Sequence, residues 1–219
     1  MLKPEWLTSD GDAAYTHVSR MIEDALSRYS NDRLGKTDFA LFSAGARIIP
    51  GLTSPTFEPP ARGLTQKLWR KMGMISSQPP VAILDPNTHI GECWPMQGSS
   101  GQVAIHLAQP VGVSDFAIEH VAKSIAIDWR SAPREIEVWG YIIGSEDSTT
   151  KHGLGRLTKL ASFEYEPSDT SALQVIRPAV GDGSALRMRT IILKIKSNWG
   201  HPEHTCIYRF RVHGHLVAL

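Results

Sequence analysis

Residues 197–214 of the chain read SNWGHPEHTCIYRFRVHG, and this run says most about the fold. Its second half alternates apolar with basic side chains, with Cys206, Tyr208, Phe210 and Val212 on one side and Arg209, Arg211 and His213 on the other. Side chains of a β-strand point alternately to the two faces of a sheet. The run therefore predicts a strand with one buried face and one basic face in water.

The same alternation recurs in three segments upstream, at 102–107, 135–138 and 190–196, although Ile192 interrupts the polar side of the last. Turn-forming residues separate the segments, for instance GSSG at 98–101. Short strands divided by such turns are typical of a β-sandwich. We therefore expect a mainly β domain over residues 36–219.

A helix is predicted before this domain, within residues 1–35. Apolar side chains recur there at spacings of three and four, namely at Tyr15, Val18, Met21, Ile22, Ala25, Leu26 and Tyr29. A helix of about five turns is not stable alone in water. Its apolar stripe must therefore pack on the following domain or on copies of itself.

Length and charge argue against several classes of protein. The chain has 219 residues, 42% of them hydrophobic, which is enough for a packed core. Lys and Arg number 23 against 22 Asp and Glu, a balance that argues against general nucleic-acid binding. No apolar run is long enough to span a membrane, and the polar start, MLKPEWLTSDGD, does not resemble a signal peptide. We expect any targeting or membrane-spanning segment to lie upstream of residue 1.

The sequence contains little that predicts catalysis. It has no G-x-S-x-G motif and no phosphate-binding glycine loop, and its carboxylates show no paired spacing. His201, His204 and Cys206 are residue types that bind zinc, so a small metal-dependent enzyme is the catalytic alternative. Hydrogen-bonded histidines are the simpler interpretation, and we expect a binding protein rather than an enzyme. Cys93 and Cys206 either form a disulfide or stay free, and composition leaves both open.

Two segments between the strands suggest functional loops. Residues 59–80 lie between pairs of prolines and contain Leu68 and Trp69, which are large apolar side chains for an ordinary loop, so we expect a flap or lid. Residues 81–93, VAILDPNTHIGEC, offer carboxylate, amide and backbone oxygens. Such a loop suits a monovalent or divalent cation. A plain turn held by Asx hydrogen bonds is the alternative.

Several separated blocks resemble one known family, the SUN domain, which is the lumenal module of inner-nuclear-membrane proteins. The blocks are DFALFSAGARII at 38–49, GECWPMQGSSGQVAIHLAQP at 91–110, EHVAKSI at 119–125, SAP at 131–133 and the run 197–214. They occur in the order that the family has. The stretch VSRMIEDALSRYS at 18–30 is also similar to the helix before the domain.

The resemblance implies a SUN-type β-sandwich with a preceding N-terminal α-helix, which forms a homotrimer through that helix or stays monomeric when the helix folds back. It implies binding to the C-terminal tail of a KASH protein in a LINC complex, which links the nuclear envelope to the cytoskeleton. The tail adds a strand under the lid, and its terminal carboxylate enters a pocket. The domain would lie in the perinuclear space, on a protein of the inner nuclear membrane. The alternative is a SUN-like sandwich that binds another lumenal protein or a carbohydrate.

The family's binding residues match positions of this chain. The lid corresponds to 59–78, where Leu68 and Trp69 would pack on the ligand or on a neighbouring protomer. The peptide pocket corresponds to Ser131, His204 and Tyr208, with His120 nearby. Hydroxyl and imidazole donors suit a carboxylate. His204 stands where the family usually has tyrosine, which adds a group that titrates near neutral pH.

The resemblance also implies a disulfide between Cys93 and Cys206 and a bound monovalent cation, with potassium as the expectation. The cation loop corresponds to Ala82, Asp85, Asn87 and Glu92, with Tyr208 close by, and most ligands would be backbone carbonyls. The disulfide would anchor this loop. Some members bond covalently to the KASH tail through an extra cysteine, but this chain has Thr53 there, so we expect non-covalent binding.

Overall fold

The computed structural model describes residues 16–22, 34–61, 63–65, 68, 77–143, 155–169, 172–179 and 186–217. Two compact units divide the chain, Met1–Thr37 and Asp38–Leu219. In the first unit, residues 16–22 are helical and expose Val18, Met21 and Ile22. The rest of the predicted helix lies outside the described residues. Among the described residues, no helix is long and apolar enough to span a membrane.

The second unit is built from antiparallel strands, with four short 3-10 helices between them in the described chain. The strands are β1 (Arg47–Ile48), β2 (Trp94–Gln97), β3 (Gly101–Glu119), β4 (Glu135–Ile142), β5 (Arg156–Glu164), β6 (Leu173–Ile176), β7 (Met188–Ile195), β8 (His204–Ile207) and β9 (Arg209–Leu216). The 3-10 helices are η1 (Phe42–Ala44), η2 (Pro50–Leu52), η3 (Pro80–Leu84) and η4 (Trp129–Ser131).

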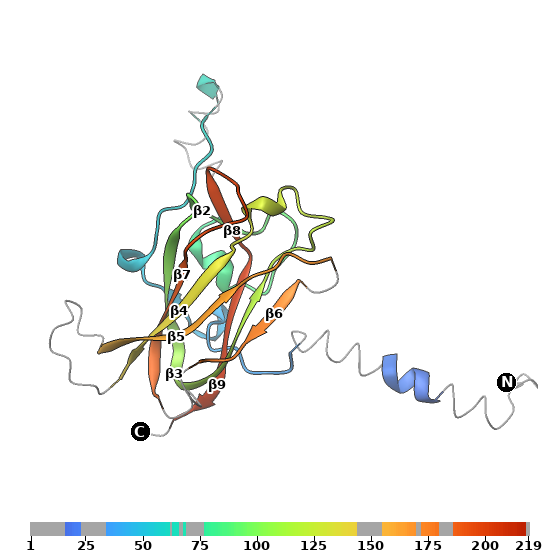
Figure 1. The fold of residues 1–219 in the computed structure, drawn as a ribbon, viewed down its shortest axis with the longest axis vertical. Helices are drawn as coiled ribbons and strands as arrows, with labels where there is room; N and C mark the ends of the chain where they lie inside the picture. The colour runs from blue at the N-terminus through green and yellow to red at the C-terminus, as the bar shows by residue number, and fades with distance from the viewer. Residues whose placement is uncertain are drawn as a thin grey trace, which may run out of the picture. The chain divides into compact units, whose positions relative to one another are not determined.

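The long strand β3 joins the two layers of a sandwich (Figure 1). Its first half lies between β1 and β7 in the order β1-β3-β7-β4-β5, and its second half pairs with β6 and β9. The pairing shifts between His106 and Val111, a stretch that contains Pro110. Proline has no N–H to donate to a ladder, so it favours a break at this point. β2 and β8 form a separate two-stranded sheet.

The core lies between the layers and comes from the alternating positions that the sequence predicts. Side chains of β3, β4 and β7 are fully or almost fully buried there, namely Val103, Ile105, Leu107, Ile136, Val138, Ile191, Leu193 and Ile195. Phe116 of β3 stacks on Phe210 of β9, with ring centroids 5.8 Å apart. The prediction of a mainly β sandwich is confirmed.

The predicted basic strand face of 205–213 is wrong in two respects. The run is not one strand, because β8 ends at Ile207 and β9 begins at Arg209 in the other sheet. Its basic side chains are not in water either, since Arg209 and Arg211 are each 1% exposed. Arg209 pairs with Asp38 at 3.0 Å and Arg211 with Glu119 at 2.7 Å.

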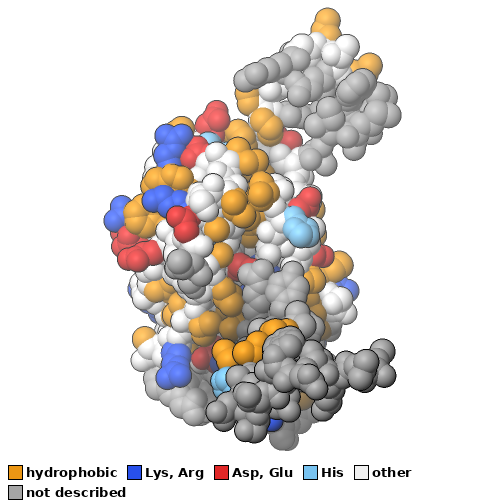
Figure 2. All heavy atoms as spheres, turned by 90° about the vertical axis from the view of Figure 1, so that its right-hand side faces the viewer, with side chains coloured by type: hydrophobic (Ala, Val, Ile, Leu, Met, Phe, Trp, Pro, Cys, Tyr) orange, Lys and Arg blue, Asp and Glu red, His pale blue; other side chains and the backbone are white. Residues whose placement is uncertain are grey.

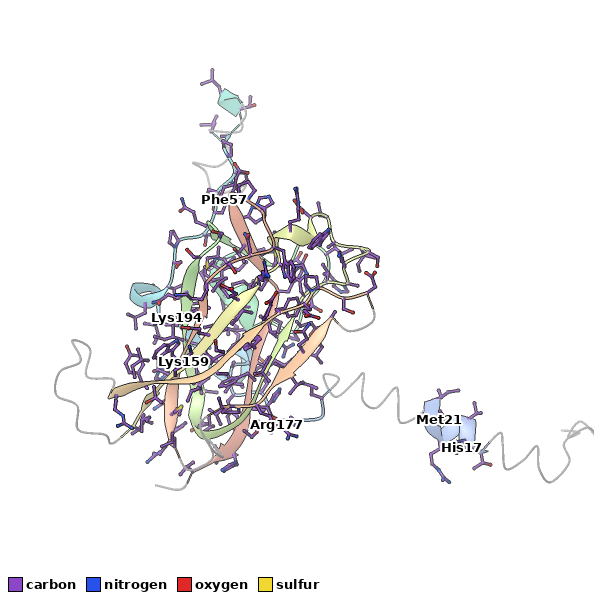
Figure 3. The ribbon with its side chains drawn as sticks, in the orientation of Figure 1. His17, Met21, Phe57, Lys159, Arg177 and Lys194 are labelled. Carbon is purple, nitrogen blue, oxygen red and sulfur yellow. A yellow bond between two sulfur atoms is a disulfide. The ribbon has the colours of Figure 1, made fainter. Side chains whose placement is uncertain are left out.

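The outer face of the β4–β7 pair explains the interrupted alternation at Ile192. Ile192 lies opposite Trp139 of β4 and is only 3% exposed. Lys194 and Lys159, both labelled in Figure 3, place their ammonium groups 4.5 Å and 5.9 Å from the centroid of the Trp139 ring. Ile192 is thus an apolar residue on the outer face, where it lies opposite a tryptophan that two lysines contact. The side of the molecule shown in Figure 2 carries Lys and Arg side chains interspersed with Asp and Glu, without a large patch of one charge.

Candidate functional site

The predicted pocket residues surround the end of the sandwich where β2 pairs with β8. Pro95 lies opposite Cys206 and Gln97 lies opposite His204. A disulfide joins Cys93 to Cys206, with Cα atoms 5.5 Å apart. The disulfide takes the Cys206 thiolate out of the alternative zinc site. Nowhere in the described chain do three His, Cys, Asp or Glu side chains lie where they could hold a metal ion together.

One group of site residues is centred on His120 and Tyr208. Their rings meet edge to face with centroids 4.7 Å apart, beside the disulfide and Val121. The hydroxyl of Tyr208 accepts a hydrogen bond from the Gly91 N–H at 3.3 Å, so its own hydrogen can still be donated to a ligand. Burial raises the pKa of Tyr208, which keeps the phenol protonated.

His120 contributes a buried polar atom to this group. Its Nδ1 lies 3.0 Å from the carbonyl oxygen of Val121, while its Nε2 is buried with no hydrogen-bond partner among the described residues. Burial lowers the pKa of His120, and the hydrogen bond to Val121 partly opposes that shift. The imidazole is therefore neutral at neutral pH. Tyr165 lies behind it, with ring centroids 6.3 Å apart, and donates a hydrogen bond to the carbonyl of Ala172 at 2.9 Å.

A second group is centred on His204. Its ring lies 4.0 Å from that of His201 and stacks on Phe57, with centroids 5.0 Å apart and planes 19° apart. His201 Nε2 lies 4.0 Å from a carboxylate oxygen of Asp128. The Ser131 hydroxyl donates to the backbone carbonyl of Asp128 at 2.7 Å. Ser131 and His204 are thus connected through Asp128 and His201.

The predicted pocket residues therefore form two contact groups, one at His204 at the start of β8 and one at Tyr208 just after its end. The structure brings His120 onto Tyr208, and it connects Ser131 to His204 through two intermediates. Cys206, between His204 and Tyr208 in the chain, bridges the two groups through its place on β8.

The lid is described only in part. Leu64, Thr65 and Leu68 are helical, and Leu64 and Leu68 are 85% and 55% exposed. Trp69, the other lid residue that we expect to contact a ligand, lies outside the described residues. The chain enters the lid through Phe57, whose N–H donates to the carbonyl of Pro95 in β2 at 2.7 Å.

The predicted cation loop begins within η3, at Ala82, and lines a cleft of about 230 Å³. Ala82, Asp85, Asn87 and Glu92 all contribute to the lining, together with apolar neighbours. Asp85 and Asn87 each accept a hydrogen bond from a backbone N–H two residues further on, at 2.8 Å and 3.1 Å. The Asx turns of the alternative interpretation are therefore present, and they hold the oxygens of this loop in place.

Sequence reasoning missed three residues of this site. Phe57 belongs to no motif, because a stacking partner of His204 is visible only in three dimensions. Asp128 does carry a local signal, since its side chain accepts a hydrogen bond from the Arg130 N–H at 3.0 Å and so caps η4. Tyr165 lies in the turn after β5, where the sequence gives no sign that it contacts His120.

The chain matches a known protein family. The family model described as Sad1/UNC-like C-terminal matches residues 74–216. The mouse "SUN domain-containing protein 2" is 35% identical over 206 residues, which are 90% of this chain and 25% of that protein. The mouse "SUN domain-containing protein 3" is 30% identical, over 93% of this chain and 60% of that protein. The chain thus spans less than two thirds of these relatives.

Solved structures resemble the chain at the level of the fold. The family 32 carbohydrate-binding module of Streptococcus pneumoniae EndoD has a TM-score of 0.51 and 14% identity, over 82% of this chain and all of that one. The C-terminal domain of a Bacteroides fragilis chitobiase has a TM-score of 0.51 and 15% identity, over 84% and 99% of the two chains. At such identities the likeness shows a shared β-sandwich and carries no argument about ligands.

Proposed function

Since the chain belongs to the Sad1/UNC-like C-terminal family, the family of the SUN domain, we propose that it is a lumenal receptor for the C-terminal tails of KASH proteins. In this role it forms part of a LINC complex at the nuclear envelope and connects it to the cytoskeleton. The observation that carries the proposal is the family match over residues 74–216. That match includes every predicted pocket residue and the whole predicted cation loop.

The pocket chemistry supports recognition of a peptide carboxylate. Tyr208 keeps a donatable phenol hydrogen. His120 Nδ1 donates to the Val121 carbonyl, so in the neutral ring the buried Nε2, which has no partner in the described chain, is unprotonated and can donate to a carboxylate only when the ring is charged. Buried polar atoms without partners are uncommon in folded proteins and often mark ligand sites. In this proposal the carboxylate lies between the two contact groups, within reach of Ser131 and His204. The tail adds a strand beneath the lid, with Leu68 and Trp69 packing on it or on a neighbouring protomer.

We also propose that the cation loop holds a monovalent ion, with potassium as the first candidate. The cleft collects the oxygen-bearing residues Asp85, Asn87 and Glu92 around Ala82. Oxygen ligands fixed by Asx turns are the donor set that a hard cation prefers. When bound, the ion would supply positive charge beside Tyr208, which holds Gly91 of the same loop.

Assembly and location follow from the same proposal. The exposed side chains Val18, Met21 and Ile22 of the helical residues 16–22 form an apolar stripe that suits a homotrimer. Folding back of this helix would instead give a monomer that does not bind. The domain would occupy the perinuclear space, on a protein of the inner nuclear membrane. With Thr53 at the position of the extra cysteine, the tail is held without a covalent bond.

Light scattering and fluorescence polarisation of the purified chain with a KASH-type peptide test the proposal. We expect a trimer that binds the free-acid peptide and loses at least about tenfold in affinity when the peptide terminus is amidated, because charge-assisted hydrogen bonds are lost. Tyr208→Phe and Ser131→Ala should each weaken binding of the free acid by a similar factor.

Matched controls are available on the outer face of the sheet. Tyr141→Phe in β4 and Ser162→Ala in β5 remove the same hydroxyl groups away from the pocket and should leave affinity unchanged. Equal affinity for the acid and the amide would contradict the carboxylate pocket. A chain that binds neither peptide as a trimer would contradict the proposed function.

A further inference from the structure

His201 and His204 form an imidazole pair at the rim of the proposed pocket. The ring centroids are 4.0 Å apart, and Phe57 stacks on the far side of His204. In Figure 3 Phe57 lies at the end of the molecule where β2 and β8 meet. Two imidazoles at this distance repel one another when both are charged, which disfavours charging both rings at once.

The hydrogen bonds of the pair distinguish its two members. His201 Nδ1 accepts hydrogen bonds from the backbone N–H groups of Glu203 and His204, both at 3.3 Å. A nitrogen that accepts must be unprotonated, so the proton of neutral His201 lies on Nε2, which faces Asp128 at 4.0 Å. Protonating Nδ1 would cost His201 both backbone hydrogen bonds. Of the two rings, only His204 could take a proton on Nδ1 without losing a hydrogen bond to a described residue.

His204 has a place for that proton. Its Nδ1 is buried and has no hydrogen-bond partner among the described residues. Burial lowers the pKa of His204 and the neighbouring His201 lowers it further, while Glu203 and Asp128 raise it by less. Without a ligand the ring is neutral and stacks on Phe57.

The elements that pack on the histidine pair differ in the charged groups that they carry. Glu203 belongs to the same turn, Asp128 caps η4, and Arg130 lies within η4. Asp128 is already paired with Arg130 at 2.8 Å. On the side of Phe57, the β2 residues are uncharged, and Glu58 accepts a hydrogen bond from the Ser77 N–H at 3.4 Å. In the described chain the carboxylates near His204 do not outweigh the burial that lowers its pKa.

We propose that His204 takes up a proton when a peptide carboxylate enters the pocket, so that this chain binds its ligand more tightly as the pH falls. The proposal rests on the proposed function, since it needs a carboxylate ligand. The proton comes from solvent, and the imidazolium then donates from Nδ1 to the incoming carboxylate. His201 acts as the positioning residue, because its two accepted hydrogen bonds shape the turn that presents His204.

The direction of the pH dependence follows from linkage. A carboxylate stabilises the charged ring, so the pKa of His204 is higher in the complex than in the free protein. Affinity therefore rises as pH falls through the bound-state pKa and levels off below the free-state pKa. One coupled proton limits the gain to about tenfold per pH unit.

The test measures peptide affinity at about pH 7.5 and about pH 5.5, with the histidine protons followed by NMR in both states. We expect the wild-type chain to bind the free-acid peptide about three- to tenfold more tightly at the lower pH. The His204 resonance should titrate at higher pH in the complex than in the free chain. His204→Phe keeps the stack on Phe57 without a titrating group, and its residual affinity should not depend on pH.

Two further variants separate the possible results. His201→Asn retains an acceptor for the turn without titrating, so its pH dependence should persist. His215→Gln replaces an exposed histidine at the far end of β9 and should behave as the wild type. Equal affinity at both pH values would overturn this inference and leave the proposed function intact. A pH dependence that persists in His204→Phe would do the same. Absence of binding at both pH values would overturn the inference and the proposed function together.

Discussion

The two halves of the run 197–214 use basic side chains in opposite ways. In β9, Arg209 and Arg211 are almost completely buried, and each meets a carboxylate. His201 in the turn before β8 and His204 at the start of β8 are only partly buried, and a nitrogen of His204 has no partner in the described chain. A buried charge that is paired with an opposite charge stabilises one arrangement of the chain, while an uncharged imidazole without a charged partner at the rim is available to a ligand. The difference separates the residues that hold the fold from those that we assign to binding.

Removing one partner of a buried ion pair tests the role that we assign to β9, and it should give the largest loss of stability. Arg211→Ala leaves Glu119 buried without its guanidinium, and we expect a loss of about 3–5 kcal/mol in the free energy of unfolding. Urea denaturation followed by tryptophan fluorescence measures this loss.

The matched control is the double variant Arg211→Met with Glu119→Leu. It removes both charges and fills the space with apolar atoms, so it should recover most of the stability that the single variant loses. If Arg211→Ala costs less than about 1 kcal/mol, Glu119 is reached by water, and the contrast between the two halves of the run fails.

The disulfide lies between these two regions, and breaking it should give the next largest effect. The bond closes a loop with a sequence separation of 113 residues, so the variant Cys93→Ser with Cys206→Ser should lose about 2–5 kcal/mol of stability. Because Cys93 follows Glu92 directly, we also expect the variant to lose any stabilisation that added potassium gives the wild type. Thermal melts with and without potassium measure both effects. A variant as stable and as potassium-sensitive as the wild type would show that the bond anchors nothing.

Most of the sandwich could be predicted from the sequence because its core positions are periodic. β3, β4 and β7 each place apolar side chains at every second residue, and the structure buries those positions. The environment of Arg209 and Arg211 could not be predicted in the same way. Their carboxylate partners are 171 and 92 residues away in the chain, so nothing near them in sequence distinguishes a buried arginine from a solvated one.

The site could be predicted less completely than the fold. Composition left the pairing of Cys93 with Cys206 open, and only the family resemblance implied it before the structure was known. The contact of His204 with Phe57 joins a turn near the end of the chain to the residue before the lid, and no local pattern encodes such a contact. Interactions between distant residues define this site, whereas the strands follow from neighbours two positions apart.

The smallest effect on stability is expected at Asp128, which contacts Ser131 and His201 near the proposed pocket. The hydrogen bond from Arg130 lowers the pKa of Asp128 to about 2, from an ordinary value of 3.8, and partial burial opposes the shift. A carboxyl whose pKa is lower in the folded state contributes stability above its unfolded-state pKa and loses it as pH falls toward about 2. Because the pair is exposed and screened by solvent, the contribution is small.

Asp128→Asn keeps an oxygen that can cap η4 and removes only the charge. Its stability should therefore differ little from that of the wild type near neutral pH, and the difference should vanish as the pH falls from about 4 to about 2. Chemical denaturation of both chains across this range measures the difference directly. A difference that stays constant with pH would show that the charge of Asp128 is not what distinguishes the two chains.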